Sequence, residues 1–181
     1  MKKLLSFTLL LSSLISVATA QTAKGNWLLG GAASFSSSKT GDYKETNFFI
    51  APGAGYFFAD NFAAGASISF VTATVDDGTD KYDANAFGFA PFLRYYFVKL
   101  GNNSKLFANG MFGFASGKSD GESTNATMWQ ISAGPAIFLN PSIALEIALA
   151  YGSNKFKDAD DATNTFGINV GFQIHLNCKK K

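Results

Sequence analysis

Most of the chain is patterned by apolar residues that alternate with small or polar ones, which is the period of a β-strand. The last such segment runs from Phe166 to Leu176, where large apolar residues alternate with glycine, amide and histidine residues. The same alternation predicts eight strands, separated by segments rich in turn-forming residues. The predicted strands cover residues 25–37, 45–58, 62–75, 82–98, 105–117, 125–139, 143–153 and 163–176.

These strands are unusually long, because the common strand length is about 5–6 residues. A tilted strand of about 9–11 residues is long enough to cross a bilayer. Two architectures fit the alternation. A soluble barrel buries its apolar face and presents the polar one to water, whereas a transmembrane barrel turns its apolar face to lipid. The alternation alone does not choose between them.

The distribution of charge favours the transmembrane barrel. Charged residues are 15% of the chain, against about 25% in soluble domains. Only Arg94 and Glu146 lie well inside a predicted strand, and both are on the face of small and polar residues. A water-facing sheet carries more charge than this. We therefore predict an all-β fold, an eight-stranded antiparallel up-and-down transmembrane β-barrel with a polar lumen.

The connections agree with this topology, since longer and shorter segments alternate along the chain. Residues 36–46 form a long connection, residues 59–61 a short one, and residues 154–162 a long and charged one. Outer-membrane barrels have an even number of strands, short periplasmic turns and longer outside loops. We therefore expect both termini in the periplasm, three turns beside them, and four loops outside the cell.

The first 20 residues have the features of a signal peptide that is cleaved on export. Two lysines are followed by an apolar stretch from Leu4 to Val17 and by the sequence Ala18-Thr19-Ala20. This predicts a signal peptide over 1–20 and one barrel domain over 21–181, in the outer membrane of a Gram-negative cell. A membrane-anchor helix is the weaker interpretation, because the apolar stretch is shorter than the roughly 20 residues that a span needs.

Charge and cysteine content exclude some function classes. Without Lys2 and Lys3, basic and acidic residues are equal in number, so no basic surface for nucleic acid is expected. Cys178 is the only cysteine, and it cannot form an internal disulfide. No phosphate loop, zinc-ligand spacing or nucleophile elbow occurs, and we predict no cofactor, no metal and no catalytic residue.

Three segments of the barrel resemble a known family. They read IAPGAGYFFADNFAAGASISF (50–70), APFLRYYF (90–97) and ISAGPAIFLNPSIALEIALAY (131–151). They resemble the small outer-membrane β-barrel domains of the OmpA, OmpX and OmpW type found in Bacteroidetes, across essentially the whole of residues 21–181. The resemblance implies contact with outer-membrane lipids and lipopolysaccharide, insertion by the outer-membrane assembly machinery, and an extracellular ligand bound through the loops.

Arg94 and Glu146 are the strongest candidate site. Both are on the lumen face, a few residues from the periplasmic ends of their strands, and an eight-stranded lumen is narrow enough for opposed side chains to meet. We predict an ion pair that fills the lumen, which lowers the cost of holding either charge there. A gate or selectivity point is the alternative. The polar neighbours predicted on the same face are Tyr96, Asn109, Gln130, Gln173 and His175.

The remaining candidates have simpler explanations. His175 is the only histidine, and it lies at the predicted periplasmic end without a Ser or acidic partner in view. The acidic segments 76–83 and 157–161 lack the spacing of a Ca²⁺ loop and are expected to be solvated loops.

The sequence therefore predicts a non-enzymatic barrel with a structural or surface-interaction role and a filled lumen. A narrow passive channel for small, including hydrophobic, solutes is the alternative. A lipid-modifying enzyme of the outer leaflet is weaker still, because the outer strand ends lack a His-Ser-acid set.

Overall fold

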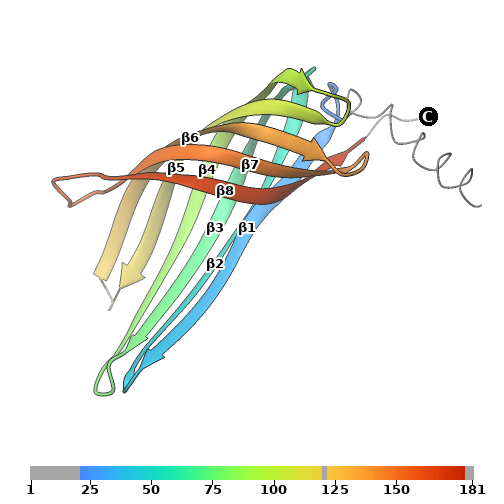
Figure 1. The fold of residues 1–181 in the computed structure, drawn as a ribbon. Helices are drawn as coiled ribbons and strands as arrows, with labels where there is room; N and C mark the ends of the chain where they lie inside the picture. The colour runs from blue at the N-terminus through green and yellow to red at the C-terminus, as the bar shows by residue number, and fades with distance from the viewer. Residues whose placement is uncertain (1–20, 120–121, 178–181) are drawn as a thin grey trace, which may run out of the picture.

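The computed structural model describes residues 21–119 and 122–177, and the predicted signal peptide and Cys178 lie outside these ranges. Eight antiparallel strands follow one another around a closed barrel in chain order (Figure 1). The strands are β1 Trp27–Thr40, β2 Tyr43–Ala59, β3 Phe62–Asp76, β4 Lys81–Leu100, β5 Ser104–Ser119, β6 Glu122–Phe138, β7 Ile143–Phe156 and β8 Thr163–Leu176. The predicted fold class and all eight strands are confirmed.

The structure corrects the predicted connections at one end of the barrel. The predicted loop 36–46 is a two-residue turn, because β1 continues to Thr40 and β2 begins at Tyr43. Gly41 has a φ of 63°, which is the left-handed conformation that such a turn needs. The connection between the predicted strands 105–117 and 125–139 is likewise shorter than predicted, because β5 ends at Ser119 and β6 begins at Glu122. Backbone pairing continues into the polar ends of these hairpins, where no apolar residues alternate. Hydrophobic alternation therefore underestimates the length of these strands.

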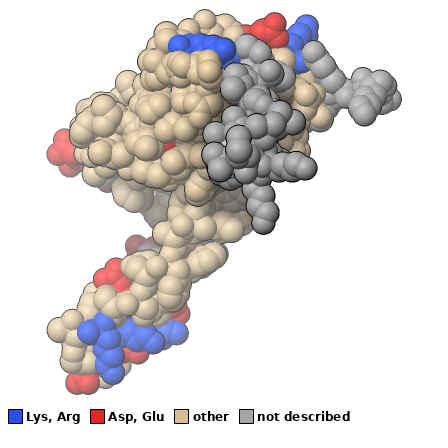
Figure 2. Space-filling view, turned by 45° about the vertical axis from the view of Figure 1, so that its right-hand side comes forward, with Lys and Arg blue, Asp and Glu red and all other residues tan. Residues whose placement is uncertain are grey.

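The two faces of the sheet differ as the alternation predicted. Large apolar side chains point outward, and residues such as Ile131 and Leu149 keep 57% and 56% of their surface exposed. Small residues and most of the strand-interior polar ones point inward. Figure 2 shows charged side chains gathered toward the ends of the molecule, with a largely uncharged surface between them. This arrangement suits a bilayer, because the outer surface meets lipid.

We call the end of the barrel with the three short turns the base, and the opposite end the rim. At the base, residues 21–26 precede β1 and lie against the barrel, where Gln21, Thr22 and Asn26 are almost completely buried. The Gly25 N–H donates to the Phe57 carbonyl at 2.9 Å, and the Phe57 N–H donates to the Asn26 carbonyl at 2.9 Å. This segment therefore forms part of the base.

The described part of the chain contains no helix long and apolar enough to cross a membrane.

A charge on the outward face tests this orientation of the sheet. Leu149→Arg places a cation in the apolar belt, and we expect it to lower the free energy of unfolding by about 2–4 kcal/mol in lipid vesicles. Ser153→Arg, on the same face of β7 and nearer the rim, is the matched control and should cost about 0–1 kcal/mol. Urea titration measures both. Equal tolerance of the two substitutions would contradict the lipid-facing assignment.

Candidate functional site

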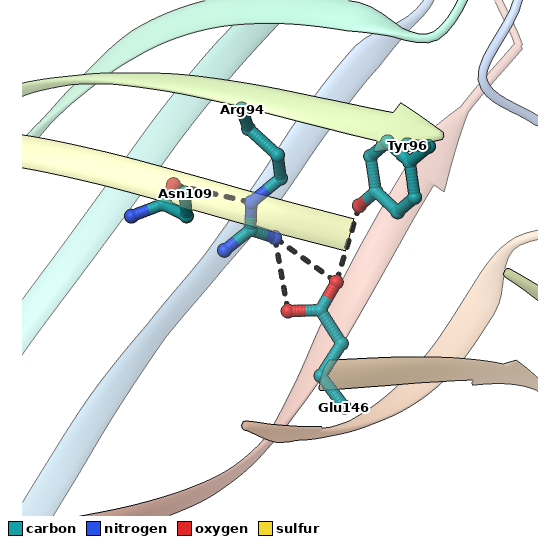
Figure 3. Close-up of polar contacts among 4 residues, drawn as sticks. All are labelled: Arg94, Tyr96, Asn109 and Glu146. Carbon is teal, nitrogen blue, oxygen red and sulfur yellow. Dashed lines mark hydrogen bonds and ion pairs between the residues drawn. The ribbon is translucent and has the colours of Figure 1, made fainter. Parts of the chain in front are cut away.

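Arg94 of β4 and Glu146 of β7 meet inside the barrel (Figure 3). The Arg94 Nη1 group donates to both carboxylate oxygens of Glu146, at 3.0 Å to Oε1 and 2.9 Å to Oε2. The two side chains are only 11% and 7% exposed. Because β5 and β6 separate the two strands in the barrel wall, the pair spans the lumen.

Neighbouring groups complete the hydrogen bonding of this pair. The Tyr96 hydroxyl donates to Glu146 Oε1 at 3.1 Å, and Arg94 Nε donates to the Asn109 side-chain oxygen at 3.2 Å. The guanidinium carbon of Arg94 also lies 4.7 Å from the centre of the Phe107 ring. A buried ion pair is tolerated when further hydrogen bonds and cation–π contacts offset its desolvation. Two of the predicted neighbours, Tyr96 and Asn109, therefore touch the pair directly.

A layer of rings lies on the base side of the ion pair, and we call it the plug. Phe57 stacks on His175 at 5.9 Å between ring centres, and Tyr96 lies 5.9 Å from Phe57. The ring of Phe138 meets His175 edge-on at 5.2 Å. The plug comprises Phe57, Tyr96, Phe107, Phe138 and His175, all almost fully buried. His175 is thus a packed ring of the plug.

The base holds a second polar cluster, which the sequence did not reveal. Lys105 Nζ donates to Thr22 Oγ1 at 2.6 Å and to the Asn61 side-chain oxygen at 2.8 Å. The Asn61 N–H donates to the Thr22 carbonyl at 2.7 Å. Lys105, like Phe107 and Asn109, occupies an odd-numbered position of β5 and therefore points into the barrel. This alternation is the one feature of the sequence that could have indicated its burial.

Gln21 joins the same base to the turn between β6 and β7. Its side-chain amide donates to the Asn140 carbonyl at 3.1 Å, and its own carbonyl accepts from Asn26 at 3.2 Å. His175 Nδ1 also lies 3.2 Å from the Gln21 carbonyl. Because one segment binds β5, β8 and two turns, residues 21–26 close the end of the barrel beneath the plug.

A cavity of about 660 Å³ lies on the rim side of the ion pair. The predicted neighbours Gln130 and Gln173 line this cavity, and they form no hydrogen bond with the pair among the residues described. Gln173 instead packs against Gly30, where a Cβ atom would overlap its side chain. Apolar side chains, including Phe92, Met111 and Met128, share the wall. The lumen is therefore open on the rim side and filled on the base side.

The acidic loop segments are placed at the rim. Within residues 21–119 and 122–177 no group of three His, Cys, Asp or Glu side chains is arranged to hold a metal ion. In the loop after β3, the backbone N–H groups of Asp80 and Thr79 donate to the Asp77 carboxylate at 2.8 and 2.9 Å and lower the pKa of this exposed group. Asp77 therefore binds the backbone of its own turn.

The family model described as "Outer membrane protein beta-barrel domain" matches residues 7–173. The chain belongs to this family. It is therefore an outer-membrane barrel of a Gram-negative cell, and the short turns of the base face the periplasm. No match was found among curated proteins.

Two solved structures share the fold. The outer membrane protein OprG from Pseudomonas aeruginosa is 14% identical, with a TM-score of 0.53 over 87% of this chain and 99% of that protein. Neisserial surface protein A is 11% identical, with a TM-score of 0.54 over 85% of this chain and 97% of that protein. At these identities the likeness concerns the fold alone.

Removing one partner of the ion pair should destabilise the barrel strongly. Glu146→Ala leaves the Arg94 guanidinium buried without its carboxylate, and we expect a loss of about 3–5 kcal/mol in the free energy of unfolding. The apolar double variant Arg94→Met/Glu146→Leu should recover most of that loss, because no uncompensated charge remains. Urea titration of the folded barrel compares the three proteins. Unchanged urea and heat resistance of Glu146→Ala would contradict a stabilising pair.

A double-mutant cycle tests the base cluster. Lys105→Met and Thr22→Val each remove one side of the Nζ–Oγ1 hydrogen bond, so their effects on the free energy of unfolding should not add. We expect a coupling energy of about 0.5–3 kcal/mol. If the two changes in the free energy of unfolding simply added, Lys105 would not bind residues 21–26 in the membrane.

Proposed function

We propose that this protein is a non-enzymatic outer-membrane scaffold with a structural or surface-interaction role, and that its lumen does not conduct. The observation that carries the proposal is the sealed base. The Arg94–Glu146 pair crosses the lumen, the rings of the plug lie beneath it, and residues 21–26 lie beneath the plug. A solute entering from the rim side meets three successive obstructions made of buried side chains.

The rim is the proposed interaction surface. The hairpins β1–β2 and β5–β6 continue well beyond the apolar belt, and their polar ends reach away from the membrane. A ligand or partner outside the cell would bind these hairpins and the loops between the other strands. Lipids and lipopolysaccharide would surround the apolar belt, and the assembly machinery would act during insertion.

A narrow passive channel is the second candidate. The cavity of about 660 Å³ favours it, because this volume is within the range of small-molecule sites, about 300–1,000 Å³. Its wall combines Met and Phe side chains with amides, which suits a small solute with an apolar part. Passage to the periplasm would still require the Arg94–Glu146 pair and the plug to move.

Planar-bilayer conductance separates the two candidates. We expect no discrete openings from the wild-type barrel, because the base is filled. The triple variant Arg94→Ala/Tyr96→Ala/Glu146→Ala removes the ion pair but leaves four rings of the plug and residues 21–26 in place, so it should also give no openings. Discrete and reproducible openings of the wild type would overturn the scaffold proposal in favour of the channel.

A further inference from the structure

A groove of about 570 Å³ lies on the outer surface of the barrel near the rim, separate from the lumen. It crosses four neighbouring strands, from β4 through β5 and β6 to β7. Two cross-strand rows of exposed residues line it. The row nearer the rim is Phe87, Ser116, Asn125 and Lys157, and the row nearer the base is Phe89, Phe114, Thr127 and Lys155.

The chemistry of this groove changes from one side to the other. On the β4 side it is apolar, because the phenylalanine rings of β4 and β5 keep about half of their surface exposed. The middle is polar and uncharged, with the hydroxyl groups of Ser116 and Thr127 and the amide of Asn125. On the β7 side it carries Lys155 and Lys157. A ligand that fits all three parts has an apolar portion, several hydrogen-bonding groups and a negative charge.

The two lysines are available to such a ligand. Among the residues that the structure describes, neither of them forms an ion pair, although residues 158–161 include three aspartates. Lys155 Nζ makes one hydrogen bond, 3.3 Å to the Asp160 carbonyl, and an ammonium group has three N–H donors. The Lys157 N–H donates to the Asn125 carbonyl at 2.8 Å, which holds its backbone against β6. Because alternate residues of a strand lie about 7 Å apart, both side chains can contact one anion.

The groove lies where the outward face of the barrel leaves the hydrocarbon region. Along β7 the outward residues change from Leu149 through Tyr151 to Lys155. Tyr151 meets Trp129 of β6 edge-on, at 5.7 Å between ring centres. Such rings are typical of the boundary between membrane and water. The groove is on the rim side of this pair and the base faces the periplasm, so the groove lies among the headgroups of the outer leaflet.

We propose that this groove binds one molecule of lipid A, the phosphorylated glycolipid that anchors lipopolysaccharide in the outer leaflet. Lys155 and Lys157 bind a phosphate group, for which lysine is a common partner. The hydroxyl and amide groups in the middle of the groove hydrogen-bond the sugar, and acyl chains follow Phe89 and Phe114 toward the apolar belt. The site is outside the lumen, so it does not depend on whether the barrel conducts.

The arrangement of the groove favours a glycolipid over a phospholipid. Two hydroxyl groups and an amide separate the lysines from the rings, and a sugar ring offers hydrogen-bonding groups for all three. The glycerol unit of a phospholipid offers few. The positive charge of the β7 side is complementary to the phosphate groups of lipid A, and each lysine near an anionic membrane surface strengthens binding about fivefold.

Binding of purified lipid A to the folded barrel in detergent micelles, followed by native mass spectrometry, tests this site. Lys155→Gln/Lys157→Gln removes both charges, and we expect binding about 25-fold weaker than that of the wild type. Lys155→Arg/Lys157→Arg keeps the charges and should retain the wild-type affinity. The matched control is Lys39→Gln/Lys44→Gln, which removes another pair of rim lysines, paired between β1 and β2 and outside the groove, and should leave the affinity unchanged.

Equal dissociation constants for the wild type and Lys155→Gln/Lys157→Gln would overturn the proposal. An equal loss in the Lys39→Gln/Lys44→Gln control would also overturn it, because binding would then follow net charge and not the groove. Two further probes are lipid A without its phosphate groups and phosphatidylglycerol. The wild type should bind each of them about as weakly as the glutamine variant of the groove binds lipid A. If phosphatidylglycerol bound as tightly as lipid A, the groove would be a site for anionic phospholipid and the assignment to a glycolipid would be wrong.

Discussion

The hydrogen bonding of the backbone in lipid is the constraint on which the rest of this structure depends. Because the hydrocarbon region offers no partner for an N–H or C=O group, a sheet can span it only when its strands pair around a ring. Eight long strands in chain order meet this requirement with the shortest connections. β1 and β8 close the ring by pairing residues 27–30 with residues 173–176.

A small barrel leaves little room inside, and this explains the character of the lumen. Inward positions are mostly glycine, alanine, serine and amides, and most of the large inward rings gather at the base, whereas Phe92 lines the cavity. A charge can be held there only with its partner, as the Arg94–Glu146 pair is with Tyr96 and Asn109. The filled base and the hollow rim side follow from this uneven distribution of side-chain volume, and the proposed scaffold role depends on the packing of the base.

The strands and their orientation could be predicted from the sequence because alternation and charge are local properties. Arg94 and Glu146 could be chosen because they were the only charges well inside the predicted strands, although only the structure shows that they meet. The base cluster of Lys105, Thr22 and Asn61 depends on three distant segments coming together, and no local pattern encodes that. Gln130 lies six residues toward the rim from Ala136, the β6 partner of Glu146, and Gln173 lies two residues toward the base from Gly171, the β8 partner of Glu146.

An accessibility scan along one strand tests the central claim most directly, namely that the apolar face meets lipid and the polar face encloses the lumen. Spin labels at successive positions from Ile143 to Ser153 of β7, in lipid vesicles, report their exposure to oxygen dissolved in the bilayer. The account predicts a period of two, with high oxygen accessibility at the odd-numbered positions of the Ile147 and Leu149 face and low accessibility at Glu146, Ala148 and Ala150. The opposite phase, or no alternation, would contradict it.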